Sequence, residues 1–282
     1  DATRWYMVTA GAPWNPLKFD SNGVRETYAK MFLTLWNVYK FHADYAALDG
    51  FDPEQSTSDV ASRSSLDRWI LSRLATTANN YHADFKQWNF HKACRDLEEF
   101  IVNDVSNWYV RRSRDRFWDG SDTDALDTLY TVLETVSRVA APLAPLVTEE
   151  VWRGLTGGES VHLTNWPDAT EFPADDALVM AMDTVRDVAS AGLALRKAHG
   201  LRVRLPLNSL TIVTENVAGV DDFRDILAEE LNVREILTRE LDDQVAGELG
   251  IGKKLLPQAR VLGPRLGSKV QAIIQGAKAG DW

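Results

Sequence analysis

Apolar side chains recur every three or four residues along much of the first half of the chain, which is the spacing that places them on one face of an α-helix. Within residues 21–50, Val24, Tyr28 and Met31 follow this interval. The pattern predicts one long amphipathic helix across this range. Gly50 and a run rich in Ser, Thr and Asp then interrupt it.

Further helical segments continue the same period. Ser64 offers an N-cap oxygen and is followed by an acid three residues later, an arrangement that satisfies the free amides at the start of a helix. Pro142 ends the last long run, because proline cannot continue a helix. We expect helices at 64–88, 90–118, 121–141 and 145–155. Together with the first one they predict a helical bundle.

The composition changes in the second half of the chain. Residues 157–176 are rich in Gly, Pro and Asp, which is typical of a connection between domains. The elements expected after this connection are helices at 176–199, 221–231 and 264–278 and strands at 209–214 and 234–241. We therefore predict a mainly α fold, in which a helical-bundle domain at 21–172 is followed by a smaller α+β domain at 173–282.

Composition fits a folded protein that works in a reducing compartment. The 282 residues are 45% hydrophobic and carry a net charge of −10. The single cysteine, Cys94, cannot form an internal disulfide or a zinc site alone, which favours a cytoplasmic location. No stretch reaches the roughly 20 apolar residues of a membrane span, and the first residues lack a signal-peptide pattern. We expect no membrane association.

One short stretch departs from the acidic average. Residues 107–118, NWYVRRSRDRFW, combine aromatic rings with arginines. On a helix Trp108, Arg112 and Arg116 share one stripe, because residues four apart are neighbours. Aromatic rings stack on unpaired bases and guanidinium groups hold phosphates, so the stretch is a candidate surface for single-stranded RNA. The competing interpretation places Trp108 in the core and pairs the arginines with neighbouring acids.

The sequence contains no motif of a complete active site. It has no G-x-x-x-x-G-K-[ST], no G-x-G-x-x-G after a strand, no G-x-S-x-G and no H-E-x-x-H. Glu98 and Glu99 are adjacent, as are Glu149 and Glu150, so each pair diverges on a helix and is poorly placed for acid–base catalysis. We expect no catalytic residue and no metal site within this chain.

SNWYVRRSRDRFW closely resembles a helix in the anticodon-binding domain of the isoleucyl-tRNA synthetase family, which belongs to the class I aminoacyl-tRNA synthetases. FLTLWNVYKF resembles the first helix of that domain, and APLAPLVTEEVW resembles its turn between the fourth and fifth helices. DATRWYMVTAGAPWNPLKFD is similar to the segment just beyond the family's KMSKS loop. EELNVREI and VLGPRLGSKVQAIIQGAKAGDW are similar to its C-terminal region, so the resemblance extends over the whole chain.

The resemblance implies a C-terminal fragment of an enzyme that joins isoleucine to its tRNA. ATP and Mg²⁺ are implied for the full enzyme, and no cofactor is implied for this fragment. HIGH-type and KMSKS motifs are missing, so we expect the fragment alone to be inactive, with the catalytic domain acting in cis. Residues 1–20 would be the remnant of the segment that joins the two domains. The implied partner is isoleucine-accepting tRNA.

The resemblance and the chemistry of the stretch predict the same RNA contacts. Trp108 and Tyr109 would stack on anticodon bases. Asn37, at the matching LWNVY position, would offer a donor and an acceptor to a base, unless it is a polar residue bonded between helices. The side chains expected to hold phosphates or base edges are Arg111, Arg112, Arg114 and Arg116.

Two other functions fit parts of the sequence. The related valyl enzymes have a similar architecture but tend to carry an acid where this chain has Arg111 and Arg112, which favours the isoleucyl assignment. The alternative from another class is a helical module that binds protein partners through exposed aromatics, with the arginines as rim contacts. Salt separates these classes, because phosphate contacts weaken steeply with ionic strength and a hydrophobic interface does not.

Overall fold

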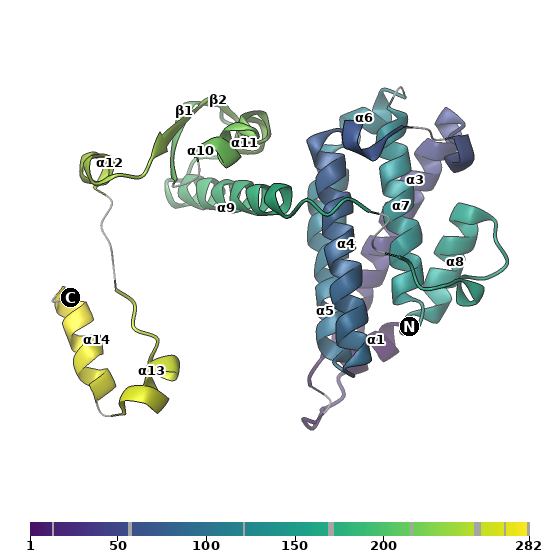
Figure 1. Ribbon diagram of the computed structural model, residues 1–282, viewed down its shortest axis with the longest axis horizontal. Helices are drawn as coiled ribbons and strands as arrows, with labels where there is room; N and C mark the ends of the chain where they lie inside the picture. The colour runs from purple at the N-terminus through teal and green to yellow at the C-terminus, as the bar shows by residue number, and fades with distance from the viewer. Residues whose placement is uncertain are drawn as a thin grey trace. The chain divides into compact units, whose positions relative to one another are not determined.

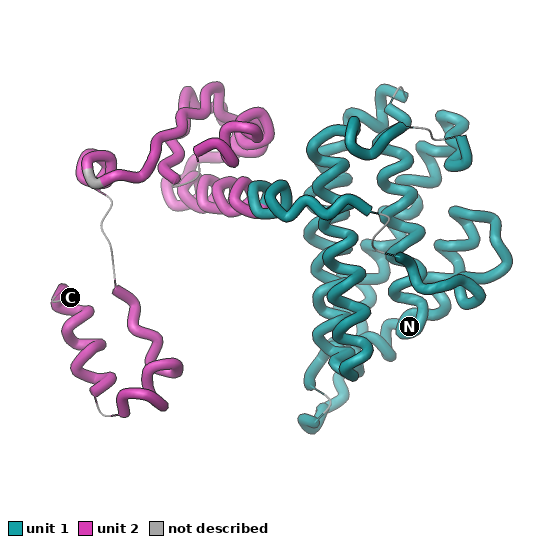
Figure 2. Tube along the Cα trace, viewed as in Figure 1, with its two compact units in different colours: residues 1–182 teal, residues 183–282 magenta. Residues whose placement is uncertain are grey.

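The computed structural model describes residues 1–282 except 13, 56–57, 121, 169–171, 215–216, 251–254, 268 and 281–282. The chain forms two compact units, residues 1–182 and 183–282 (Figure 2). The division falls inside helix α9 (Asp176–Ala198), beyond the boundary at 172 that the sequence suggested. Among the described residues, no helix is both long and apolar enough to cross a membrane.

The first unit is a bundle of helices (Figure 1). Its α-helices are α1 (Ala2–Thr9), α2 (Ser21–Thr27), α3 (Leu33–Asp49), α4 (Ser65–Lys86), α5 (Phe90–Glu99), α6 (Arg114–Trp118), α7 (Thr123–Ala140) and α8 (Pro145–Thr156). The described residues of this unit also form two π-helices, η1 (Tyr28–Phe32) and η4 (Phe100–Val110), and three short 3₁₀ turns at Pro53–Gln55, Val60–Ser62 and Val161–Leu163.

The bundle is held together by large apolar side chains. Helix α4 packs against α5, α7 and η4, and α7 also packs against α3 and α8. The largest fully buried side chains are Trp5, Met31, Leu35, Trp69, Ile70, Leu71, Leu74, Tyr81, Leu97, Phe100, Tyr109 and Phe117, all in the first unit. Burial of this apolar surface is the main force that stabilises the unit. The predicted mainly α fold with a helical bundle is confirmed.

The N-cap of α4 is formed as the sequence predicts. The Oγ atom of Ser64 accepts a hydrogen bond from the amide of Asp67 at 3.2 Å, and its hydroxyl donates to Asp67 Oδ2 at 2.8 Å. The first turn of α4 therefore begins at a fixed point.

Two predicted continuous helices are interrupted. Residues 21–49 pass through α2, η1 and α3, and Gly50, with φ of 63°, ends the last of these. The segment expected as one helix over 90–118 is divided into α5, η4 and α6. A π-helix has wider turns than an α-helix, so it shifts the phase of every side chain that follows it.

Residues 2–9 form helix α1, within the segment 1–20 that the resemblance implies joins two domains. The indole of Trp5 is fully buried, and its Nε1 donates to Glu98 Oε2 at 3.1 Å. Its ring meets that of Phe32 edge-on, with 6.0 Å between the ring centroids. Through Trp5, α1 is held against α5 and the end of η1.

The second unit is a small α+β fold. Strands β1 (Leu207–Thr214) and β2 (Val233–Glu240) pair in parallel, with Leu207 opposite Val233. A parallel pair needs a crossover connection, and α10 (Val217–Asp221) and α11 (Arg224–Leu231) supply it. Strand β1 begins two residues before the predicted segment 209–214, and β2 is shifted by one residue from the predicted segment 234–241.

The C-terminal helices of this unit are α12 (Asp243–Leu249), α13 (Ala259–Leu266) and α14 (Lys269–Ala279). The prediction of one helix over 264–278 is wrong. Gly267 has a φ of 51°, which no helix accommodates, and it separates α13 from α14.

Candidate nucleic-acid interface

The aromatic and arginine stretch 107–118 spans the end of η4, a helical step at Arg111 and Arg112, and α6. Ser113 breaks the helix, with φ of −92° and ψ of 3°. Helix α6 lies at the end of the bundle where α4 begins (Figure 1). The break separates Arg116 from Trp108 and Arg112, so the three-residue stripe that a continuous helix would give is not formed.

Trp108 and Tyr109 are both buried, so neither ring is placed as the sequence predicted. Trp108 is 7% exposed and Tyr109 is 0% exposed. The hydroxyl of Tyr109 donates to Asp67 Oδ1 at 2.7 Å. Burial and the neighbouring carboxylate raise the pKa of Tyr109 well above its ordinary value, so the hydroxyl keeps its proton and remains a donor. In this structure neither ring has a free face for an RNA base.

Arg111, Arg112 and Arg114 form what we call the arginine segment, residues 111–114. The guanidinium carbons of Arg111 and Arg112 lie 5.9 and 5.6 Å from the centroid of the Trp108 ring. Arg111 is exposed and Arg112 is half-buried. A cation over an indole face is attracted by the ring quadrupole, so the buried Trp108 supports the two arginines.

Arg114 is an exposed member of the arginine segment. Its side chain is exposed, and it makes no hydrogen bond or ion pair with any residue that the structure describes. Trp118, at the end of α6, is 74% exposed. A cationic and an aromatic side chain thus face solvent on the same short helix.

Arg116, by contrast, is fully engaged with carboxylates. Its Nη1 and Nη2 atoms donate to the two oxygens of Asp67 at 2.8 and 2.7 Å, and Nε donates to Asp122 Oδ2 at 2.6 Å. Burial alone would lower the pKa of Arg116, but the hydrogen bonds to Asp67 and Asp122 raise it. Asp67 is fully buried and the Arg116 side chain is 24% exposed, so this ion pair is anchored in the interior through its carboxylate. The predicted phosphate contact by Arg116 does not fit this geometry.

Asn37 lies exposed on α3, which packs against η4. One turn further on, Phe41 contacts Phe117 with 5.0 Å between the ring centroids. Residues four apart share a helix face, so Asn37 lies on the same side of α3 as Phe41, which contacts α6. An exposed amide here is open to a ligand, which the interhelical interpretation of Asn37 did not expect.

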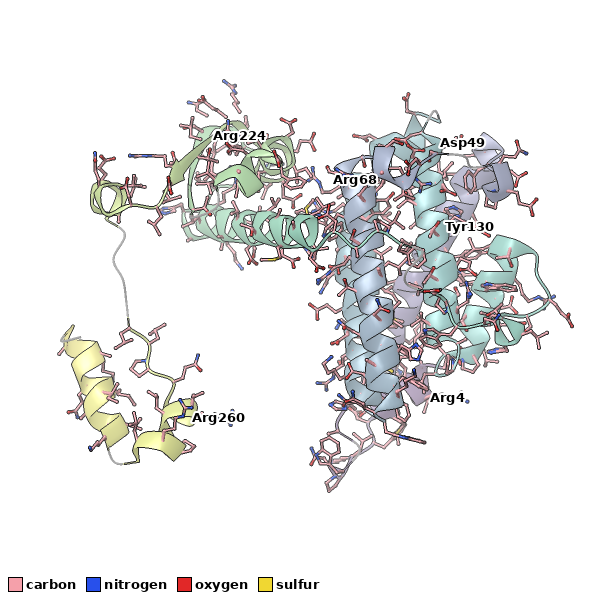
Figure 3. The ribbon with its side chains drawn as sticks, in the orientation of Figure 1. Arg4, Asp49, Arg68, Tyr130, Arg224 and Arg260 are labelled. Carbon is pink, nitrogen blue, oxygen red and sulfur yellow. The ribbon has the colours of Figure 1, made fainter. Side chains whose placement is uncertain are left out.

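Sequence reasoning missed the acids that organise the stretch and one further arginine. Asp67 was visible as a capping acid, but its bond to Arg116 joins residues that are 49 positions apart. Arg68 follows it on α4 and is seen at the same end of the bundle as α6 (Figure 3). It is half-buried, and its side chain has no hydrogen-bond or ion-pair partner among the described residues.

A family model described as the anticodon-binding domain of tRNA ligase matches residues 67–212, which include η4, the arginine segment and α6. The chain belongs to this family. The region therefore contains Asp67, Arg68 and the whole stretch 107–118.

Whole-chain relatives of this anticodon-binding domain are isoleucine–tRNA ligases. That of Leifsonia xyli subsp. xyli is 47% identical over 100% of this chain and 25% of its own length. That of Mycobacterium tuberculosis is 45% identical over 100% of this chain and 26% of its own length. The chain spans about a quarter of the length of the curated relatives it matches.

Among solved structures, the LeuRS–tRNA–LeuAMS ternary complex of Agrobacterium radiobacter K84 covers 86% of this chain and 28% of its own chain. It does so at 15% identity with a TM-score of 0.47.

Proposed function

We propose that this chain binds the anticodon region of an isoleucine-accepting tRNA as part of an isoleucine–tRNA ligase. Its family membership and the isoleucine–tRNA ligases to which it is similar support this proposal. The observation that carries it is the exposure of Arg111 and Arg114 in a chain with a net charge of −10. Binding of a polyanion depends on the local field, and this segment concentrates positive charge.

Each side chain at this surface receives a role that its placement allows. Phosphates or base edges are held by Arg111, Arg112 and Arg114. The Trp108 ring lies against the guanidinium groups of the first two. Trp118, rather than Trp108 or Tyr109, offers an exposed ring to an unpaired base. The exposed amide of Asn37 hydrogen-bonds a base, and Arg68 adds a further cation at the same end of the bundle.

The activity of the whole protein is part of the same proposal. It attaches isoleucine to tRNA in the cytoplasm with ATP and Mg²⁺, which are bound outside this chain. The 282-residue chain by itself forms no aminoacyl adenylate, because its sequence holds no ATP-binding motif. Isoleucine-dependent pyrophosphate exchange by the purified chain would contradict this.

A filter-binding titration tests the RNA-binding function directly. The chain is titrated against isoleucine-accepting tRNA and against an unrelated tRNA, at about 50 and about 200 mM salt. We expect tighter binding to the isoleucine tRNA and a steep loss of affinity at the higher salt. Weak binding to both tRNAs, or affinity that salt leaves unchanged, would instead favour a protein-interaction module.

A further inference from the structure

The side chains of Tyr109 and Arg116, one on each side of the arginine segment, donate hydrogen bonds to the same carboxylate, that of Asp67. Tyr109 lies two residues before Arg111, and Arg116 lies two residues after Arg114. The Tyr109 hydroxyl and Arg116 Nη1 donate to Asp67 Oδ1 at 2.7 and 2.8 Å. Hydrogen bonds next to both ends of the segment therefore attach it to one residue of α4, Asp67.

Asp67 is suited to hold such a fastening. It is fully buried and accepts four side-chain hydrogen bonds, one from Tyr109, two from Arg116 and one from Ser64. Charge-assisted hydrogen bonds in a buried site are short and strong. Because its own backbone lies in the capped first turn of α4, the carboxylate is held rigidly.

A second carboxylate closes the arrangement. Asp122 accepts from Nε of Arg116 at 2.6 Å, and it also accepts from the amide of Ala125 at 3.1 Å as the N-cap of α7. Arg116 thereby joins α6 to the first turns of both α4 and α7. Its Nε, Nη1 and Nη2 atoms all donate to these two carboxylates, so a phosphate would have to displace one of them.

We propose that Asp67, through Tyr109 and Arg116, positions the arginine segment for RNA, which makes all three positioning residues rather than RNA contacts. This inference rests on the proposed function. A segment that is ordered before binding does not lose this conformational freedom when RNA arrives, so preorganisation increases affinity without adding a contact.

Removal of the Asp67 charge distinguishes positioning from simple electrostatics, because the two predict changes in tRNA affinity of opposite sign. Asp67→Asn removes a negative charge beside an RNA-binding surface, and by charge alone this should strengthen RNA binding. Positioning predicts the opposite, because the amide cannot hold Arg116 through two acceptor oxygens. Filter binding with isoleucine-accepting tRNA should show affinity lowered by about tenfold. Tighter binding than the unmodified chain would overturn the proposal.

Tyr109→Phe tests the same idea with less risk to the fold. It keeps the buried ring and every charge, and loses only the hydroxyl that reaches Asp67. The matched control is Tyr81→Phe, which removes the hydroxyl of another fully buried tyrosine on α4. We expect tRNA affinity to fall about threefold to tenfold for Tyr109→Phe and to stay unchanged for Tyr81→Phe, with both proteins folded by circular dichroism.

Hydrogen exchange distinguishes local loosening of the arginine segment from general destabilisation of the bundle. In Tyr109→Phe the amides of residues 110–116 should exchange faster, while those in the middle of α4 and α7 keep their protection. Uniform loss of protection across the bundle, or normal tRNA affinity in this variant, would overturn the positioning role.

Failure of the unmodified chain to bind tRNA would overturn the proposed function itself. Normal binding by the unmodified chain together with normal binding by Tyr109→Phe would overturn the positioning inference alone. The two failures are therefore distinguished in one titration series.

Discussion

Ionisable side chains have opposite environments in the interior of the helical unit and in its arginine segment. In the interior, Asp67 and Arg116 form a bidentate pair, and the Asp67 carboxylate is entirely removed from water. At the surface, Arg111 and Arg114 face solvent within the same stretch of sequence. The residue type is the same and the positions differ by two to five, yet one arginine holds helices together and the others remain accessible.

The difference teaches which property each side chain can affect. A buried charge is costly to leave alone, so loss of its partner lowers stability. An exposed arginine contributes little to stability, so its loss should lower only the affinity for a ligand. Stability and RNA affinity should therefore separate along the stretch, and the following variants test that separation.

The largest effect is expected for Trp108→Ala. The indole is 7% exposed and supports two guanidinium groups, so its removal leaves a cavity under them. We expect the free energy of unfolding to fall by about 3–5 kcal/mol in chemical denaturation. Trp118→Ala is the control, because Trp118 is 74% exposed and its loss should stay within about 0.5 kcal/mol. Equal effects of the two variants would remove the distinction between the regions.

Arg116→Ala should come next. It leaves the buried carboxylate of Asp67 without its bidentate partner, although Tyr109 and Ser64 still donate to it. We expect a loss of about 3 kcal/mol in unfolding free energy, measured by urea denaturation. If the variant is as stable as the parent, the ion pair seen in the interior does not hold the helices together.

Buried His42 should make the interior sensitive to acid. Its ring is 2% exposed, its Nε2 lies 3.1 Å from the carbonyl oxygen of Leu126, and burial lowers its pKa from 6.5 to about 4. The unfolded chain therefore binds a proton at a higher pH than the folded one. Stability from this group is complete above about pH 6.5 and falls as pH drops toward 4, by about 2–3 kcal/mol.

Denaturation of the parent and of His42→Gln at several pH values measures this contribution. Glutamine can still donate to the Leu126 carbonyl but does not titrate. The slope of stability against pH between about 4 and 6.5 should be shallower in the variant. Parallel slopes in the two proteins would show that His42 does not titrate differently in the folded and unfolded chains.

Local signals in the sequence predicted much of this fold but not its contacts. The hydrophobic period predicted the helices of the bundle, and the Ser64 cap forms as expected because capping depends on residues three apart. Trp108 and Tyr109 were misplaced because spacing tells which side chains share a face and not whether that face meets the core. The η4 π-helix and the break at Ser113 then changed the phase on which the arginine stripe depended.

The hydrophobic pattern could not predict contacts between residues that are far apart in the sequence. Tyr109 finds Asp67 across 42 positions and Arg116 finds it across 49. Neither bond leaves a periodic trace, because the first depends on how α4 lies against η4 and the second on how α4 lies against α6. Arg114 needs no long-range partner and is exposed, as its predicted role requires.

The smallest change in stability, and a selective change in affinity, is expected for Arg114→Ala. The side chain is exposed and has no partner among the described residues, so unfolding free energy should change by less than about 0.5 kcal/mol. If Arg114 neutralises a phosphate, affinity for isoleucine-accepting tRNA should fall and the slope of log affinity against log salt should become shallower by about 1. Arg114→Lys keeps the charge and should restore most of the slope. A variant that binds tRNA with unchanged affinity and slope would remove Arg114 from the interface, and Arg111 and Arg112 would then be tested in the same way.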